Sequence, residues 1–361
     1  MDKYKPDDKT KLEKATRLLP LANDLEQYRQ DLGDGTKTFR GLVTGFNEVD
    51  DLISGLDRFI LLAGRSGAGK TTLATQLALG VAEHTPVLFY SLEMSKSEIT
   101  TMMLQVLAKG LPRNEIDLQG NDPKLPTQSK TMLDKAFNDL AQLAGNIYVI
   151  DTTGGIPRIA DPKDANSIFN TVESLKTKHN AERVLVIVDS VQDIVPLTNN
   201  QVQAEVQTLQ ELTEVQQKTG ATILVLAQKP KSSISSDDNY GDVMGSMSFI
   251  HKPNTVLDLI TAKEHLYKLK KEAKAYKNKE KAIEAEQLEK DIEADAKDGY
   301  AKPMYLDVIK GRNTGTDKIP LQFYGKYGYF EGGKSKRYAE VYNPFDKWYN
   351  IRSKTERPNG Q

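Results

Sequence analysis

Residues 58–84 read RFILLAGRSGAGKTTLATQLALGVAEH, and the fold follows from this stretch. Residues 58–64 are a short apolar run, which is the pattern of a buried parallel strand. Residues 64–71 match G-x-x-x-x-G-K-[ST], and residues 70–83 have helical character. Because this motif binds phosphate where it joins a strand to a helix, the sequence predicts a phosphate-binding loop here.

The loop contains the groups that hold a nucleotide. Its glycines let backbone N–H groups curl around phosphate oxygens, and the helix N-terminus adds a partial positive charge. We expect Lys70 to reach the β- and γ-phosphates of ATP and Thr71 to offer its hydroxyl to Mg²⁺. A chance match in an ordinary glycine-rich turn is the alternative, which the strand-to-helix context disfavours. The predicted nucleotide-binding residues are Gly64, Arg65, Ser66, Gly67, Ala68, Gly69, Lys70, Thr71 and Thr72.

Four further apolar runs resemble the first, and helical stretches separate them. This alternation predicts an α/β fold with a doubly wound, mostly parallel sheet and right-handed crossovers. The predicted strands are 58–64, 87–92, 147–150, 184–189 and 221–227, and the predicted helices include 70–83, 95–109, 163–179 and 202–219.

Polar residues that follow or end three of these strands are candidates for catalysis. Asp189 ends a strand, where a parallel sheet faces its ligand, so it could join Thr71 in holding Mg²⁺ or could cap a helix. Glu93 could orient the attacking water, or it could cap the helix that starts near Ser95. Gln228 could report the γ-phosphate to a nearby loop, or it could be a polar strand end.

The composition limits the classes to which the chain can belong. A length of 361 residues, 38% hydrophobic and 27% charged, suits a globular fold with a full core. Without cysteine, neither a disulfide framework nor a cysteine-based zinc site can form. The net charge of −1 gives no overall basic field, so DNA contact must come from a local patch. No apolar run approaches a membrane span, which favours a cytoplasmic location without membrane contact.

Three regions differ from the alternating core at 41–330. The pattern of residues 1–40 predicts a charged helical arm with an apolar stripe, which would pack either on its own domain or on a neighbouring subunit. Residues 263–302 are rich in Lys, Glu and Ala without an apolar stripe, which predicts a solvated helix or helical hairpin inserted in the core; a protruding partner-binding arm is the alternative. We expect part of the tail at 331–361 to be disordered.

Several motifs follow one another along the chain. They are T-G-F-N-E-V-D (44–50), the phosphate-binding loop, S-L-E-M-S (91–95), I-D-T-T-G (150–154), V-D-S-V-Q (188–192), L-A-Q-K (226–229) and K-G-R-N (310–313). In this order they resemble the ATPase domain of replicative DnaB-type helicases. The resemblance implies a RecA-like P-loop NTPase that forms a hexameric ring. Such a ring would hydrolyse ATP, translocate on single-stranded DNA and unwind duplex during replication.

The resemblance also implies roles for residues far from the loop. In that family, a Lys and an Arg project from a hairpin into the ATP site of the adjacent subunit. They correspond to Lys310 and Arg312, which would act as a finger on the neighbour's γ-phosphate. Without the resemblance, the same residues would be a basic hairpin tip in solvent. The family's linker helix, which closes the hexamer, corresponds to residues 25–31.

The chain departs from the family pattern in three places. We expect no N-terminal helical domain of the kind that helps to recruit primase, and the insertion at 263–302 is larger than the family leads us to expect. The family carries an Arg-Glu pair before a Gly-Ser near the DNA phosphates, whereas Val and Met stand at 243 and 244 here. Backbone N–H groups of the Gly-Ser could still bind phosphate. The candidate DNA-binding residues are Lys229, Lys231, Gly245 and Ser246.

Three alternatives to the helicase stay open. A RecA-class ATPase could form a filament or regulatory ring on DNA without unwinding, which the missing Arg-Glu pair favours. A small-molecule kinase would need an arginine-rich lid, and none is evident. An adaptor derived from a helicase would hydrolyse ATP slowly, which the intact Glu93 disfavours. The expected partner is a helicase loader or replication initiator, and the compact chain suggests a phage, plasmid or other mobile element as its source.

Overall fold

The computed structural model describes residues 41–117, 125–151, 155, 158–195, 200–229, 251–295, 301–312 and 315–332. The predicted arm at 1–40 lies outside the described residues, as does the tail beyond Gly332. Contacts divide the chain into Met1–Arg40 and Gly41–Gln361, and the structure below is that of the second unit. No described helix is long and apolar enough to cross a membrane.

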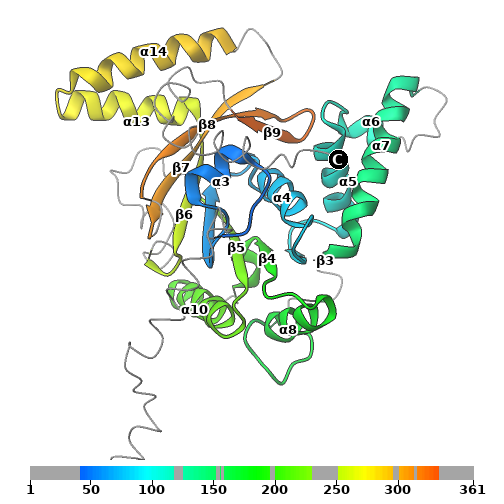
Figure 1. Ribbon diagram of the computed structural model, residues 1–361. Helices are drawn as coiled ribbons and strands as arrows, with labels where there is room; N and C mark the ends of the chain where they lie inside the picture. The colour runs from blue at the N-terminus through cyan, green and yellow to red at the C-terminus, as the bar shows by residue number, and fades with distance from the viewer. Residues whose placement is uncertain are drawn as a thin grey trace, which may run out of the picture. The chain divides into compact units, whose positions relative to one another are not determined.

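A single sheet runs through the unit (Figure 1). Its described strands are β1 (Phe59–Gly64), β2 (Val87–Ser91), β3 (Ile147–Asp151), β4 (Leu185–Asp189), β5 (Thr222–Gln228), β6 (Thr255–Thr261), β7 (Lys302–Gly311), β8 (Lys318–Tyr324) and β9 (Tyr329–Gly332). Their order is β3-β2-β4-β5-β1-β6-β7-β8-β9. The first six strands pair in parallel, and β7, β8 and β9 extend the sheet antiparallel from β6. The prediction of a mostly parallel α/β sheet is confirmed, and the antiparallel edge is an addition to it.

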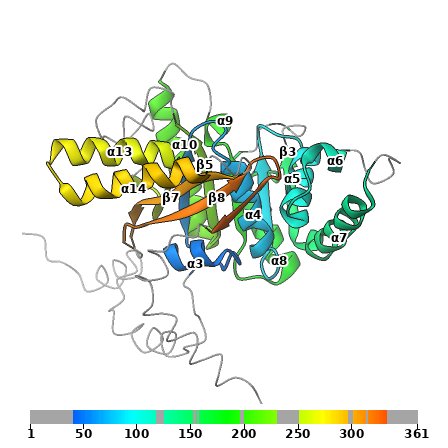
Figure 2. The same ribbon diagram turned by 90° about the horizontal axis from the view of Figure 1, so that it is seen from above.

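Helices cover both faces of this sheet, as a doubly wound fold requires (Figure 2). One face carries α3 (Asn47–Ile53), α4 (Lys70–Val81) and α5 (Lys96–Ala108), and the other carries α8 (Ile168–His179), α9 (Val191–Ile194) and α10 (Gln201–Thr219). Successive side chains of β1 point to opposite faces of the sheet, and apolar residues occupy both faces. Ile60 and Leu62 join the core on the α4 side, whereas Phe59 and Leu61 join the core on the α10 side. All four are at most 1% exposed, so the continuous apolar run reflects a strand buried on both faces.

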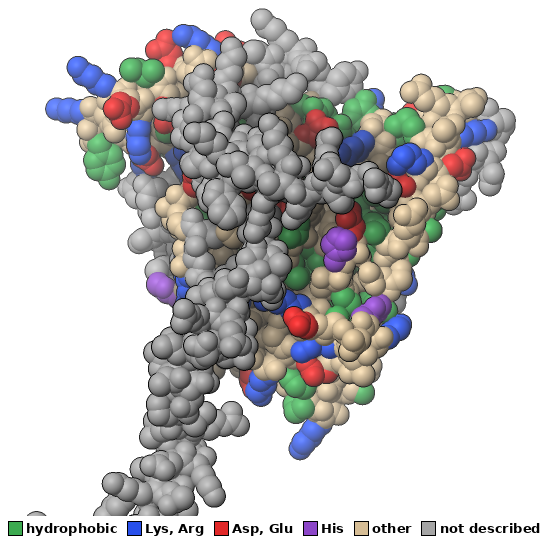
Figure 3. Space-filling model, in the orientation of Figure 1, with side chains coloured by type: hydrophobic (Ala, Val, Ile, Leu, Met, Phe, Trp, Pro, Cys, Tyr) green, Lys and Arg blue, Asp and Glu red, His purple; other side chains and the backbone are tan. Residues whose placement is uncertain are grey.

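Two helical additions lie at opposite ends of the sheet (Figures 1 and 2). Near the β3 end, α6 (Arg113–Asp117), α7 (Thr127–Leu143) and the short turn η1 (Ala144–Asn146) follow α5, and a small apolar cluster joins α5, α6 and α7. At the other end, α13 (Ala262–Ala275) and α14 (Lys279–Asp295) form a hairpin between β6 and β7. Lys, Arg, Asp and Glu side chains are interspersed over this hairpin (Figure 3).

The hairpin corrects one expectation from the sequence. The sequence predicts no apolar stripe in residues 263–302, yet Leu269, Ala285 and Leu288 are buried in one small cluster formed by the two helices. Spacing of three residues between Ala285 and Leu288 puts them on one helical face, so a short stripe does exist among the charges. The last described strand, β9, continues to Gly332, two residues beyond the predicted core at 41–330.

The T-G-F-N-E-V-D segment forms a turn that packs on the helix of the phosphate-binding loop. The buried carboxylate of Asp50 accepts hydrogen bonds from the Thr44 backbone N–H and hydroxyl, and from the Gly45 N–H. These bonds satisfy a carboxyl whose pKa is raised by burial. The turn lies so close to α4 that a Cβ added to Gly80 would stand 1.6 Å from the Thr44 carbonyl oxygen. Gly80 therefore permits contact between the turn and the helix.

Replacing Gly80 with Ala should destabilise the unit. Alanine favours helices by about 1 kcal/mol over glycine, but here its methyl group would displace backbone rather than a movable side chain. We expect Gly80→Ala to lower the free energy of unfolding by roughly 2–3 kcal/mol, measured by urea denaturation. Gly145→Ala is the matched control, because nothing lies within 4 Å of its Cβ, and it should stay within about 0.5 kcal/mol of the wild type. Equal stability of the two variants would contradict the close packing at Thr44.

Candidate active site

A cavity of about 270 Å³ opens where β1, β2, β4 and β5 end. The strand register aligns these ends along one edge of the sheet, since Gly64 pairs with Gln228 and Ser91 pairs with Asp189. Chain segments that are far apart in the sequence thus meet at the carboxyl edge of the sheet, where open α/β folds bind ligands. The cavity is lined by Ser66, Gly67, Gly69, Lys70, Thr71, Thr72, Glu93, Asp189, Ser190, Gln228 and Phe323.

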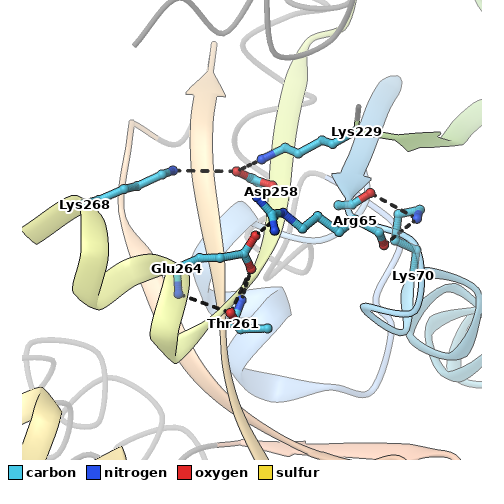
Figure 4. A network of polar contacts seen from close by, with 8 residues as sticks. Arg65, Lys70, Lys229, Asp258, Thr261, Glu264 and Lys268 are labelled. Carbon is cyan, nitrogen blue, oxygen red and sulfur yellow. Dashed lines mark hydrogen bonds and ion pairs between the residues drawn. The ribbon is translucent and has the colours of Figure 1, made fainter. Parts of the chain in front are cut away.

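The phosphate-binding loop joins β1 to α4. Gly67 and Gly69 adopt φ angles of 73° and 92°, left-handed conformations that favour glycine. The Lys70 ammonium donates hydrogen bonds of 3.1 Å to the carbonyl oxygens of Gly64 and Arg65 (Figure 4). Of the predicted nucleotide-binding residues, Gly64, Arg65 and Ala68 do not line the cavity, and the first two instead accept hydrogen bonds from Lys70.

Thr71 and Asp189 form a direct contact in the cavity. The Thr71 hydroxyl donates a hydrogen bond of 2.7 Å to Asp189 Oδ2, joining the first turn of α4 to the end of β4. Asp189 is 3% exposed, and burial raises its pKa to about 6, with the negative charge of Glu93 contributing. A buried carboxylate beside a hydroxyl offers the oxygen ligands that Mg²⁺ takes together with phosphates and water. Among the described residues, no group of three or more acidic or histidine side chains is placed to hold a metal ion.

The charges in the cavity favour a nucleotide bound together with a cation. Its charged lining residues are Lys70 and the two carboxylates, Glu93 and Asp189. Burial holds the pKa of Lys70 below its ordinary value, although both carboxylates oppose that shift. One ammonium beside two carboxylates cannot balance a triphosphate, so Mg²⁺ held at Thr71 and Asp189 would supply the missing positive charge.

Glu93 lies on a fixed turn after β2 and does not cap the next helix. The Leu92 N–H donates 2.7 Å to the Asp189 carbonyl, which ties this turn to β4. The cap of α5 is made by Ser95 and Glu98, whose side chains and backbone N–H groups bond reciprocally. The capping alternative for Glu93 is therefore wrong, and its carboxylate stays available in the cavity.

Gln228 lines the cavity with its backbone held by a residue that sequence reasoning missed. The Gln192 side chain accepts from the Gln228 N–H at 3.3 Å and donates to its carbonyl at 3.2 Å. Gln192 and the cavity-lining Ser190 both belong to V-D-S-V-Q, so this motif was the available signal. Phe323, from the antiparallel edge of the sheet, had no such signal.

Lys310 and Arg312 lie together at the end of β7, and neither lines the cavity of its own chain. The Lys310 ammonium donates to the carbonyls of His251 and Pro253 at 2.8 and 2.7 Å. Arg312 Nη2 donates to the same His251 carbonyl at 3.3 Å. Partial burial lowers the pKa of Lys310, and the charge of Arg312 adds to that shift.

The structure argues against one predicted DNA contact. The side chain of Lys229 is 8% exposed and forms an ion pair with the buried carboxylate of Asp258. Its ammonium is thus turned away from solvent, because Asp258 needs a positive partner in the interior. Lys231, Gly245 and Ser246 lie outside the described residues.

The sequence profile of the DnaB-like helicase C terminal domain family matches residues 41–332, which include the whole sheet and the cavity. The chain belongs to this family.

Relatives of this DnaB-like domain include two curated helicases. Replicative DNA helicase DnaB of Leifsonia xyli subsp. xyli is 42% identical over 79 residues, which are 21% of this chain and 17% of the relative. Replicative DNA helicase DnaB of Rickettsia prowazekii is 27% identical over 205 residues, which are 52% of this chain and 38% of the relative. The matched region is thus well under two thirds of either relative.

A solved structure shares the fold of this DnaB-like domain. It is that of a DnaB-like replicative helicase, studied with its interactions with primase. It matches with a TM-score of 0.64 at 18% identity, over 88% of this chain and 67% of that one. At this identity the match concerns the fold, which places the cavity of the DnaB-like domain on a known architecture.

Asp189→Asn should stabilise the nucleotide-free protein at neutral pH. The pKa of Asp189 is raised in the folded state, so the unfolded chain ionises first as the pH rises, and stability falls from about pH 4 to about pH 6. Above pH 6 the cost is constant, on the order of 3 kcal/mol, and asparagine should remove much of it. Urea denaturation at pH 4, 6 and 8 should show a gain for Asp189→Asn that grows between pH 4 and 6 and then levels off. A gain that is independent of pH would contradict the raised pKa.

Proposed function

We propose that the chain is the ATP-hydrolysing motor of a replicative DNA helicase. One observation carries this proposal: the cavity gathers Lys70, Thr71, Asp189, Glu93 and Gln228 from the ends of four neighbouring strands. This set supplies phosphate binding, cation binding, a base and a γ-phosphate contact, which together suit hydrolysis of a nucleoside triphosphate. Family membership supports DNA unwinding as the work that hydrolysis drives.

Each residue has a part in the proposed reaction. Backbone N–H groups of the loop and the Lys70 ammonium bind the phosphates of ATP. Thr71 and Asp189 would hold Mg²⁺, which would supply positive charge to stabilise the phosphoryl group in transfer. Glu93 accepts a hydrogen bond from the attacking water and takes its proton. Gln228 contacts the γ-phosphate, and because its backbone is held by Gln192, its side chain can respond to hydrolysis without displacing β5.

We further propose that Lys310 and Arg312 act on the ATP of a neighbouring subunit. Neither residue lines the cavity of its own chain. Both lie at the end of β7, and their side chains donate hydrogen bonds to backbone carbonyls just before β6, at His251 and Pro253. A cation supplied across an interface would stabilise the transferred phosphoryl group and couple hydrolysis to assembly. We also propose that the chain assembles as a hexameric ring around single-stranded DNA in the cytoplasm, with a helicase loader or replication initiator as partner.

A second function is worth testing because one DNA contact is weakened. Lys229 is held by Asp258, and the family's Arg-Glu pair is replaced by Val and Met at 243 and 244. An ATPase that assembles on DNA without unwinding it would tolerate both changes. Strand displacement separates this activity from a helicase.

The purified chain should unwind a forked DNA duplex when ATP and Mg²⁺ are present. Glu93→Gln should keep nucleotide binding while lowering ATP turnover by roughly 10²-fold or more, because the base is lost but the phosphate contacts remain. Fluorescent-nucleotide titration, phosphate release and displacement of a labelled strand measure the three properties. Hydrolysis stimulated by single-stranded DNA without displacement would support the second function, and unchanged turnover in Glu93→Gln would remove Glu93 from the mechanism.

Two inactive variants should restore activity to one another when mixed. Lys70→Ala removes the phosphate grip and Arg312→Ala removes the proposed finger, so each alone should lose most ATP turnover. In mixed assemblies some interfaces combine an intact Lys70 with an intact Arg312, and turnover should recover to roughly a quarter of the wild type if subunits mix at random. Activity is measured by phosphate release after co-incubation, with each variant alone at doubled concentration as control. The proposal is contradicted if ATP turnover does not recover in the mixture, or if Arg312→Ala is fully active as a monomer.

A further inference from the structure

Arg65 belongs to the phosphate-binding loop, but its side chain does not face the cavity. Its Nε lies 2.6 Å from Oε1 of Glu264, the third residue of α13 (Figure 4). The carbonyl oxygen of Arg65 meanwhile accepts a hydrogen bond from the Lys70 ammonium at 3.1 Å. Arg65 therefore contacts two groups. Its backbone carbonyl binds the lysine of the phosphate-binding loop, and its side chain binds a carboxylate outside the cavity.

Glu264 is itself held in place. Its Oε2 accepts hydrogen bonds from the Thr261 N–H at 2.7 Å and from the Thr261 hydroxyl at 2.8 Å. In return, the Thr261 hydroxyl accepts from the Glu264 N–H at 3.2 Å, which completes a capping box at the start of α13. With Oε2 occupied by the cap and Oε1 by Arg65, the carboxylate is fixed in orientation.

A second ion pair holds α13 near the loop. Asp258 on β6 is 1% exposed and lies between the ammonium groups of Lys229 and Lys268, the second of them on α13 (Figure 4). The Lys229 pair is the buried one, whereas the Lys268 side chain is 33% exposed and its ammonium lies 3.9 Å from Asp258 Oδ2. The Lys229 N–H also donates to the Gly64 carbonyl at 3.1 Å, at the first residue of the loop. The start of α13 and the start of the loop are thus tied to the same strands.

We propose that Glu264 is a positioning residue for nucleotide binding, which it serves by anchoring Arg65. When a nucleotide draws the Lys70 ammonium toward its phosphates, the loop loses hydrogen bonds at two carbonyls, and the Arg65–Glu264 ion pair still holds it in its binding conformation. Preorganisation of this kind lowers the cost of ordering a site on binding. The inference rests on the proposed binding of ATP, and it assigns the α13–α14 hairpin a role in the phosphate site.

Glu264→Gln isolates the ion pair from the helix cap. Glutamine also fits the third position of a capping box, so the variant keeps the cap and loses the charge that faces Arg65. Arg65→Met keeps an unbranched apolar stem and removes the guanidinium. Glu289→Gln is the matched control, because it removes a 2.7 Å pair with Lys270 on the same hairpin, away from the loop.

The dissociation constant of a fluorescent ATP analogue is measured for the full chain, with the melting temperature of each nucleotide-free variant. Glu264→Gln and Arg65→Met should each weaken binding by roughly three- to tenfold, and the double variant should be no weaker than either. Melting temperatures should stay within about 2 °C of the wild type, and Glu289→Gln should bind as the wild type does.

Three outcomes would overturn the proposal. Wild-type binding by Glu264→Gln would show that the pair does not act on the loop. Additive losses in the double variant would show that Arg65 acts on the nucleotide by another route. If the wild-type chain binds no ATP analogue, both this inference and the proposed function fail. If the wild type binds the analogue and Glu264→Gln binds it with the same affinity, only the inference fails.

Discussion

Parallel pairing of β1 between β5 and β6 is the constraint on which the site depends. The pairing places the loop after β1 beside the ends of its neighbours and, through β4, near the end of β2. Residues more than a hundred positions apart then meet, as the hydrogen bond from Thr71 to Asp189 shows. Without this alignment of strand ends, the carboxylates of Glu93 and Asp189 would not line the same cavity as the loop.

The cavity contains groups that cost stability in the absence of ligand. Asp189 is buried with a raised pKa, and partial burial lowers the pKa of Lys70. Both shifts mean that the protein holds each charged form at an energetic cost. A nucleotide with its cation would provide the opposite charge for both groups. The charges of the site would thus suit a bound nucleotide better than an empty cavity, and such a gain in function at a cost in stability is common in proteins.

The antiparallel edge and the α13–α14 hairpin contribute more than extra surface. Phe323 of β8 and Phe330 of β9 stack at 4.5 Å, and a Cβ on Gly69 would meet both rings within 3.0 Å. The edge thereby packs against the loop. The Gln76 side chain of α4 also forms hydrogen bonds with the backbone N–H and carbonyl of Phe330. On the other side, Glu264 holds Arg65. Two elements from the last third of the chain therefore contact the loop, at Gly69 and at Arg65.

The sequence by itself determined the parallel core and the phosphate loop, because both are written in local patterns. A continuous apolar run such as 59–63 predicts a strand buried on both faces, and the glycine spacing of 64–71 predicts the loop that follows it. Asp189, Glu93 and Gln228 could be proposed for the same reason, since each lies at or just after the end of such a run. Only the tertiary structure excluded Glu93 as a helix cap, buried Lys229 against Asp258, and brought Phe323 and Gln192 to the cavity or to a residue that lines it. These depend on pairing between distant segments, which no local pattern encodes, because the contact is set by strand order and register rather than by neighbours in the chain.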